Sequence, residues 1–191
     1  MGFLDALLGR TPAAPPNLDV LFTVAPAACT LQAALALQPT GVGAVCFRDA
    51  EGGGARRSRE EILALLRLDP ELTTEVTADE YGFTWIVCRQ PSADLAALVT
   101  ALHAINATLS DSGFGSLLLC TVIGFVTDDP PPRRLGLVYL FKRGTFYPFA
   151  PSGPQRRDTV LELRARAALS RELPIEPDLE RWFPLWNAPA P

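Results

Sequence analysis

The sequence has very few residues of the types that build catalytic and metal centres. Its 191 residues include a single histidine, His103, and no HExxH or CxxC pattern occurs. Metal sites and nucleophile–base pairs need several such residues to converge on one point. We therefore expect no catalytic residue, no metal site and no cofactor. His103 is interpreted as a residue at the boundary of a helix's apolar face.

Cysteine is present, but not in a functional pattern. Cys29, Cys46, Cys88 and Cys120 are far apart in the sequence, and each lies in or beside an apolar stretch. Free cysteine is among the most often buried residue types. All four are predicted to be reduced, buried thiols with a structural role.

Positive charge is scarce. The chain has 17 Lys and Arg against 21 Asp and Glu, a formal net charge of −4, and only one lysine, Lys142. A nucleic-acid-binding protein needs a basic surface to neutralise phosphates. No nucleic-acid partner is expected.

Long apolar runs are also missing. No stretch reaches the roughly 18 to 20 uninterrupted apolar residues of a membrane-spanning helix. The first residues lack the basic region that precedes the apolar part of a signal peptide. These features predict a cytoplasmic protein.

Length and composition predict one folded domain, since domains usually contain roughly 100 to 200 residues. Residues 1–16 are predicted to form a short amphipathic head and a proline-rich tether, 17–187 a single domain, and 188–191 a tail. Phe3, Leu4, Leu7 and Leu8 give the head one apolar helical face.

The first half of the domain mixes helices with paired strands. Asn17 is expected to cap a short helix that ends near Val24, and Ser58 and Glu61 form a capping box. Two strands are expected to be separated by Pro39-Thr40-Gly41, and a hairpin follows the second helix. The predicted ranges are strands 29–37 and 42–48, a helix over 58–68, and hairpin strands 72–77 and 81–89.

The second half predicts a meander of strands between two helices. Ser92 is expected to cap a long helix that ends near Gly113. Its apolar stripe is Leu95, Leu98, Val99, Leu102, Ile105 and Leu109. The other predicted ranges are strands 117–126, 135–141 and 145–149 and a helix over 155–172. The class is therefore α+β: a largely antiparallel sheet with three to four helices packed against it.

The stretch from Phe141 to Pro151 concentrates four aromatic residues around Gly144. It predicts a hairpin tip at Arg143-Gly144, followed by a strand that Pro148 restricts to a sheet edge. The aromatic side chains are expected to fix this edge strand to the core. Lys142 and Arg143 then remain at the turn as candidate contact residues.

Three groups of residues are candidates for contact with a partner or a membrane. The head could insert its apolar face, although the free energy of ordering it offsets much of the gain from burial. Arginines at intervals of seven would lie on one face of the last helix. The candidates are Phe3, Leu4, Leu7, Leu8, Lys142, Arg143, Arg157, Arg164 and Arg171.

Each group also has a simpler explanation. The head could be a disordered or self-docked terminus, and the arginines could form an ordinary solvated face. Trp182, Phe183 and Trp186 could build an aromatic protein-binding patch, but the favoured interpretation is that they pack the chain's end against the domain.

Several short motifs, taken in order, resemble the PspA-associated protein PspAB family. They are Gly2 to Arg10, Pro39-Thr40-Gly41-Val42-Gly43, Tyr81-Gly82-Phe83-Thr84-Trp85, Lys142 to Pro151, and Glu176 to Pro184. The resemblance runs from end to end of the chain. It implies a bacterial accessory protein of a phage-shock-type envelope-stress system, associated with PspA, a coiled-coil protein that supports the inner membrane. An HtpX-type membrane protease is a further implied associate, and no catalytic pattern is implied.

The favoured hypothesis is a non-enzymatic adaptor that acts through protein–protein contact with a PspA-type protein. A peripheral module that makes weak contact with the inner-membrane surface is the first alternative. An uncharacterised hydrolase is the second, and it would require a pocket with convergent polar groups.

Overall fold

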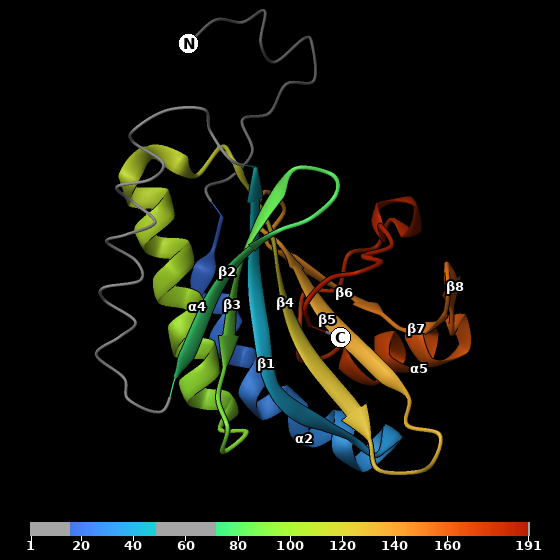
Figure 1. The fold of residues 1–191 in the computed structure, drawn as a ribbon. Helices are drawn as coiled ribbons and strands as arrows, with labels where there is room; N and C mark the ends of the chain where they lie inside the picture. The colour runs from blue at the N-terminus through green and yellow to red at the C-terminus, as the bar shows by residue number, and fades with distance from the viewer. Residues whose placement is uncertain (1–15, 49–71, 191) are drawn as a thin grey trace, which may run out of the picture.

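A six-stranded sheet organises the chain in the computed structural model, which describes residues 16–48 and 72–190 (Figure 1). The strand order is β2-β3-β1-β4-β5-β6, and every neighbouring pair is antiparallel. The strands are β1 (Leu37–Arg48), β2 (Thr73–Ala78), β3 (Phe83–Arg89), β4 (Leu118–Thr127), β5 (Arg134–Leu140) and β6 (Thr145–Phe149). The predicted α+β class, the second hairpin and the final meander are confirmed.

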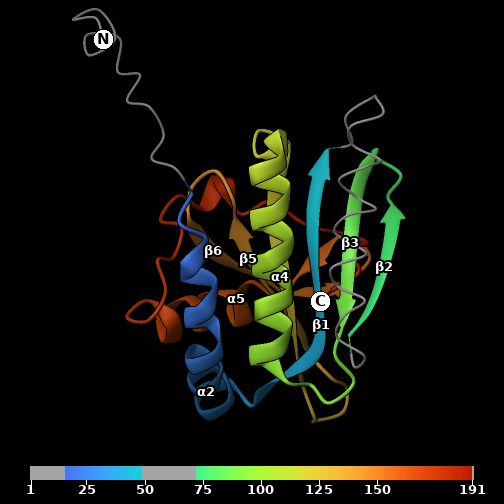
Figure 2. The same cartoon turned by 90° about the vertical axis from the view of Figure 1, so that its left-hand side faces the viewer.

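Helices cover one face of this sheet. Figure 2 shows α2 (Val24–Leu35) and α4 (Leu95–Leu109) side by side in front of the strands. A 3₁₀ turn, η1 (Leu18–Thr23), leads into α2, and α5 (Thr159–Leu169) packs beside α2 and β6. The remaining short elements are η2 (Ser110–Phe114), β7 (Pro151–Gly153), β8 (Arg156–Arg157) and η3 (Leu179–Arg181).

The long helix α4 forms where its apolar stripe predicted. All six stripe residues are buried against the sheet and α2. The cap is Asp94 rather than Ser92: its carboxylate accepts a hydrogen bond from the Ala97 amide at 3.0 Å. Gly113, with φ of 87°, interrupts the helical geometry where the stripe ends.

The predicted strand over 29–37 is wrong, because residues 29–35 belong to helix α2 and only Leu37 is in a strand, as the first residue of β1. The alanines of α2 have high helix propensity, and Pro26 lies in the first turn, where its missing amide costs nothing. The buried residues Val24, Ala28, Leu31 and Leu35 recur at helical spacing. Leu18–Leu35 as a whole is long and apolar enough to cross a membrane by length and composition, and in the fold its buried face forms part of the core.

Strand β1 runs through Pro39-Thr40-Gly41 instead of stopping there. Its register with β4 shifts between Pro39 and Gly43, so the expected break is a bulge in a continuous strand. Gly41 has φ of 73°, and a Cβ atom there would lie 2.3 Å from the Gln90 carbonyl oxygen. The bulge therefore needs glycine for two reasons, the dihedral angle and the close approach of β3.

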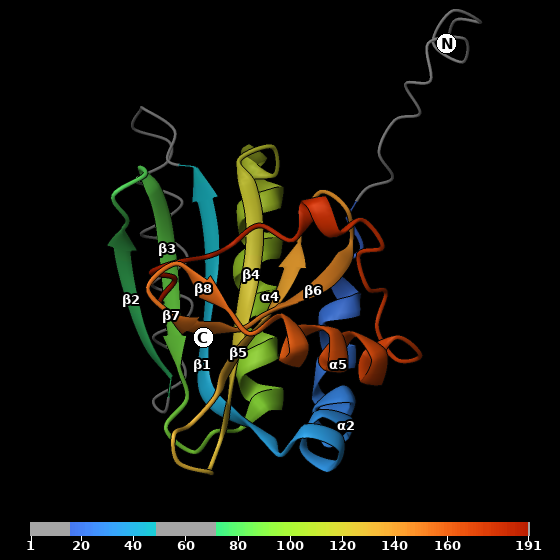
Figure 3. The same ribbon diagram turned by 90° about the vertical axis from the view of Figure 1, so that its right-hand side faces the viewer.

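The other face of the sheet is covered by irregular chain. Residues 182–190, which we call the C-terminal strap, cross this face away from α2 and α4 (Figure 3). Trp182 and Ala190 are buried there with side chains of β1, β3, β4 and β6. The expectation that Trp182 and Trp186 pack the chain's end onto the domain is confirmed, whereas Phe183 is 58% exposed.

The last helix is shorter than predicted. The β7–β8 hairpin occupies residues 151–157, and α5 begins only after Asp158, whose carboxylate accepts from the Leu161 amide. The helix ends at Leu169, before Arg171. The predicted helix over 58–68 and the head of residues 1–10 lie outside the described residues.

Replacing Gly41 with alanine should destabilise the fold more than the same change at Gly82. Both glycines have positive φ, but a Cβ at Gly82 meets no atom within 4 Å. We expect Gly82→Ala to cost about 1 kcal/mol from the dihedral angle alone and Gly41→Ala about 3 kcal/mol, because steric overlap is added. Urea denaturation of both variants measures the difference, and equal losses would refute the close approach at Gly41.

Candidate functional site

A buried carboxylate fastens the chain's C-terminal segment to the edge of the sheet. Glu176 is fully buried and accepts hydrogen bonds from the Arg143 guanidinium at 3.1 Å and from the Thr145 hydroxyl at 2.7 Å. The Phe146 amide donates to the Pro174 carbonyl, and the Glu176 amide donates to the Phe146 carbonyl. These bonds cover the open edge of β6 and join the hairpin tip to the segment that leads into the strap.

The charge state of Glu176 is set by two opposing effects. Burial alone would raise the pKa of this carboxyl. The hydrogen bonds from Arg143, Thr145 and the Asp178 amide, together with the positive charge of Arg143, outweigh burial and bring the pKa below its usual range. The side chain is therefore ionised at neutral pH.

Further contacts hold the strap on the sheet. The Tyr147 hydroxyl donates to the Phe183 carbonyl at 2.9 Å, and the Arg157 guanidinium donates to the Trp182 carbonyl at 2.7 Å. The rings of Phe149 and Trp186 meet edge to face at 5.1 Å. The strap thus has fixed backbone positions, although it forms no strand.

Between the strap and the sheet lies a cavity of about 470 Å³, which we call the aromatic pocket. Its walls come from β1, the β2–β3 turn, β3, β4, β5, β6 and the strap. Its aliphatic lining includes Leu119, Leu140 and Leu185. Six aromatic side chains supply most of the remaining wall: Tyr81, Phe83, Trp85, Tyr147, Phe183 and Trp186.

One carboxylate, that of Asp79, lies in the wall of this pocket. Its Oδ1 accepts hydrogen bonds from the Tyr81 and Phe83 amides, and its Oδ2 accepts one from the Trp85 indole, each at 2.9 Å. Asp79 therefore orders the β2–β3 turn and orients two aromatic walls. No lysine, arginine or histidine is among the described residues that line the pocket.

Two thiols line the pocket from neighbouring strands. Cys46 on β1 is directly opposite Cys120 on β4. A hydrogen bond with Cys120, followed by burial, raises the pKa of the Cys46 thiol far above its ordinary value. Burial likewise raises the pKa of the Tyr147 hydroxyl, so both groups are protonated and uncharged at neutral pH.

The predicted contact residues lie in different environments. Lys142 and Arg143 are exposed at the hairpin turn, as expected, but Arg143 is already paired with Glu176.

Arg157 is in β8, where it pairs with the buried Glu162 and does not belong to the last helix. The single arginine face expected for the last helix is therefore wrong, because only Arg164 of the three lies within α5. The head residues Phe3, Leu4, Leu7 and Leu8 are outside the described part of the chain.

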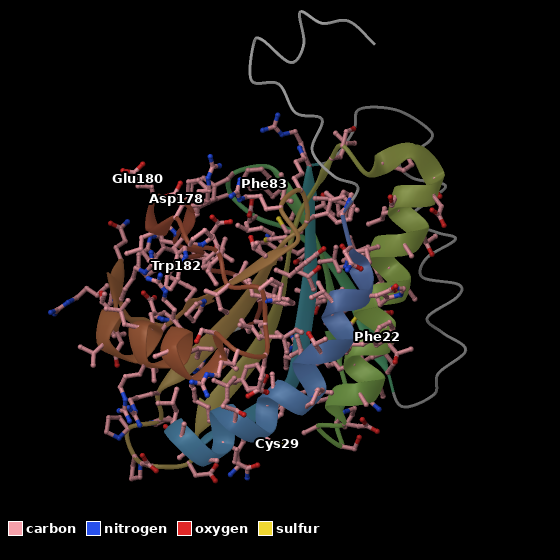
Figure 4. The ribbon with its side chains drawn as sticks, turned by 180° about the vertical axis from the view of Figure 1, so that it is seen from behind. Phe22, Cys29, Phe83, Asp178, Glu180 and Trp182 are labelled. Atoms are coloured by element: carbon pink, nitrogen blue, oxygen red, sulfur yellow. The ribbon has the colours of Figure 1, made fainter. Side chains whose placement is uncertain are left out.

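His103 and the cysteines do not form a common centre. His103 lies 3.3 Å from Asp19 and packs on the ring of Phe22, on the helix side of the sheet. Cys46 and Cys120 belong to the core on the opposite face. The prediction of four buried thiols holds for Cys46, Cys88 and Cys120 but is wrong for Cys29, which is exposed on α2 (Figure 4).

Sequence reasoning missed the aromatic pocket and the role of Glu176. The alternation of Phe83 and Trp85 on β3 does show that both side chains share one face. Nothing in the sequence shows that residues 183–186 lie opposite them. Glu176 lies between Pro174 and Pro177 in an irregular segment, and in the sequence it resembles an ordinary surface acid.

A family model described as PspAB, PspA associated protein B, matches residues 1–190. No curated protein and no solved structure matches the chain. The family match therefore covers both the aromatic pocket and the segment that Glu176 fastens.

Replacing Glu176 with glutamine should lower stability at neutral pH by about 2 kcal/mol, because bonds to an ionised group are lost. The pKa of Glu176 is lowered in the folded state, so its contribution is present above the unfolded-state pKa and disappears as the pH falls through the folded-state pKa. We expect the difference between wild type and Glu176→Gln to shrink from about pH 5 toward pH 3.

Chemical denaturation at a series of pH values measures this difference. Asp129→Asn is the control, because Asp129 forms only an exposed pair with Arg133 and should change stability by less than about 0.5 kcal/mol. A wild-type and Glu176→Gln difference that does not vary with pH would contradict the proposed role of the carboxylate.

The four thiols should react at very different rates. Cys29 is exposed, whereas burial raises the pKa of Cys88 to about 12 and contact with Cys120 raises that of Cys46. A disulfide reagent that consumes thiolate should therefore titrate one cysteine rapidly in the native protein and all four after unfolding. Cys29→Ser should abolish the rapid phase; a remaining rapid phase would show that a sheet cysteine is accessible.

Proposed function

The chain belongs to the PspAB family, and from this membership we propose that it is a non-enzymatic accessory protein that contacts a PspA-type coiled-coil protein in an envelope-stress response. The family's name supports a link with PspA. We place this contact on the cytoplasmic side of the inner membrane.

The observation that carries the proposal is an exposed apolar face on α5. Val160 is 69% exposed and Leu163 is 44% exposed. Arg164 and Ala167 are also exposed and continue the spacing i, i+3, i+4 and i+7. We call Val160, Leu163, Arg164 and Ala167 the α5 surface.

This surface has the pattern by which one helix packs on another. Apolar residues at three- and four-residue spacing form the seam of helix pairs and coiled coils. The opposite face of α5 is already used, because Leu161, Ala165 and Leu169 are buried in the core. The outward seam is thus available to a partner helix without any change in the domain.

The neighbouring residues favour a partner with acidic side chains. Arg164 lies on the α5 surface, and Arg171 is exposed in the turn just after the helix. Leu179, 51% exposed, lines a small surface hollow together with Leu163. A helix with an apolar seam flanked by carboxylates would complement both features.

The chemistry of the aromatic pocket also supports a binding role. Cys46 and Tyr147 have raised pKa values, so neither is prepared as a nucleophile or base at neutral pH. The sheet separates these groups from His103. A hydrolase is for this reason the less supported alternative.

The membrane-surface alternative depends mainly on Phe3, Leu4, Leu7 and Leu8, which lie outside the described residues. Its second element, an arginine stripe on one helix, is reduced to Arg164, because Arg157 lies in β8 and is paired with Glu162 and Arg171 follows the end of α5. Flotation of the full chain with anionic vesicles tests this alternative. Salt-sensitive flotation that needs residues 1–10 would favour it over the adaptor.

Binding to a purified PspA-type protein should weaken about tenfold in Leu163→Ser, because burying a leucine side chain contributes about 1.5 kcal/mol or more. Phe22→Ser is the matched control: Phe22 has the same 44% exposure but lies on the helical side near α4. Titration calorimetry or light scattering measures both variants and a deletion of residues 1–10.

Equal loss in Leu163→Ser and Phe22→Ser would remove the α5 surface from the proposal. The absence of any complex between the wild-type chain and the partner at tens of micromolar would refute direct contact. Loss of binding only in the deletion variant would assign the contact to the head instead.

A further inference from the structure

The residues that line the aromatic pocket are more specific than a simple packing void between the strap and the sheet would require. Its described lining residues include six aromatic side chains and one carboxylate, but no lysine, arginine or histidine. A volume of about 470 Å³ lies within the roughly 300 to 1,000 Å³ of small-molecule sites. We propose that the aromatic pocket binds an organic cation, a substituted ammonium group carried on an apolar body.

The electrostatics of the wall favour positive charge. Aromatic faces attract cations through their quadrupole, and the carboxylate of Asp79 adds a full negative charge. The adjoining surface hollow is lined by Asp79 and Glu80, and its described lining residues also include no lysine, arginine or histidine. An anionic ligand would be repelled, and a neutral ligand would lack the charge–charge attraction that both acids offer to a cation.

The remaining polar groups of the pocket do not neutralise this field. The Cys46 thiol and the Tyr147 hydroxyl are uncharged, and the Tyr147 hydroxyl is already engaged with the Phe183 carbonyl. Among the described residues no cation forms an ion pair with Asp79. The pocket therefore combines an uncharged, apolar interior with a fixed negative charge in its wall.

The ligand also has a way in. Tyr81 in the β2–β3 turn is 64% exposed and Phe183 in the strap is 58% exposed, and both line the pocket. Glu80 accepts a hydrogen bond from Asn187 at 3.0 Å, which links the turn to the strap. Two exposed aromatic rings thus flank an opening between elements that are held together.

Asp79 is already ordered without a ligand. Its three hydrogen bonds come from the Tyr81 amide, the Phe83 amide and the Trp85 indole, so the carboxylate is fixed before binding. A fixed charge beside oriented rings costs little ordering free energy when the ligand arrives. The same bonds take three of the roughly four acceptor sites of the carboxylate. No second carboxylate is among the described residues that line the pocket, and a metal ion needs several oxygen ligands, so an organic cation is favoured over a metal.

Three probes with one alkyl chain separate charge from hydrophobicity. Octyltrimethylammonium, 1-octanol and octanoate are titrated separately into the full chain, with tryptophan fluorescence and calorimetry as readouts. The two ionic probes are kept below their micellar concentrations and 1-octanol below its solubility limit in water. Trp85 and Trp186 line the pocket and report occupancy. We expect the cation to bind at least tenfold more tightly than octanol, and octanoate to bind more weakly than octanol.

Two variants test the assignment to residues. Asp79→Asn keeps an oxygen acceptor for the turn and should reduce the preference for the cation over octanol to less than threefold, while octanol binding persists. Tyr81→Leu keeps an apolar side chain at an exposed position and should weaken cation binding more than Tyr81→Phe does. Asp129→Asn, an exposed acid in another turn, is the control and should change neither affinity.

The proposal is overturned if the ammonium and octanol bind with equal affinity, if no probe saturates at millimolar concentration, or if Asp79→Asn retains both its thermal stability and the full cation preference.

Co-sedimentation with phosphatidylcholine vesicles distinguishes a free organic cation from the ammonium group of a lipid headgroup. Protein that binds the soluble probe but stays in the supernatant takes a free cation. Sedimentation that is lost in Asp79→Asn but kept after deletion of residues 1–10 identifies a lipid headgroup. Because the α5 surface is a different site, these outcomes do not depend on binding to a PspA-type protein.

Discussion

The ion pair between Arg143 and the buried Glu176 is the contact on which the second half of the molecule depends. It lies where the β5–β6 turn meets the segment after α5, and it joins two parts of the chain that are 33 residues apart. Because the carboxylate is fully buried, loss of Arg143 would leave its negative charge without an ion-pair partner. The backbone bonds around Phe146 then extend the sheet edge and set the path of the strap.

The two faces of the sheet are covered in physically different ways. Helices α2 and α4 cover one face with regularly spaced aliphatic residues, which are buried against the strands. The strap covers the other face with a few large aromatic residues on irregular backbone. Such a cover leaves space between its rings and the strands, and the aromatic pocket is that space. None of the four residues of the α5 surface lines the aromatic pocket, so the two proposed sites use different side chains.

The spacing of apolar residues in the sequence correctly predicted those helices and strands that bury only one face. The stripe from Leu95 to Leu109 and the alternation from Phe83 to Val87 identified α4 and β3 because each has one buried face. The segment around Cys29 is a helix although its apolar run also suits a buried strand, because its alanines favour the helix and packing against α4 and α5 buries one side of it. The Cys46–Cys120 pair, the partner of Glu176 and the opposing walls of the pocket are contacts between distant segments, for which a single sequence carries no signal.

The strap also imposes an order on folding. It is C-terminal to all six strands, so Trp85, Tyr147 and their neighbours on that face have no cover until the final residues of the domain have been synthesised. Until then a growing chain presents an uncovered aromatic sheet face, a surface that favours association with other chains. The negative charges of Asp79 and Glu80 at the rim of this face would limit such association between identical chains.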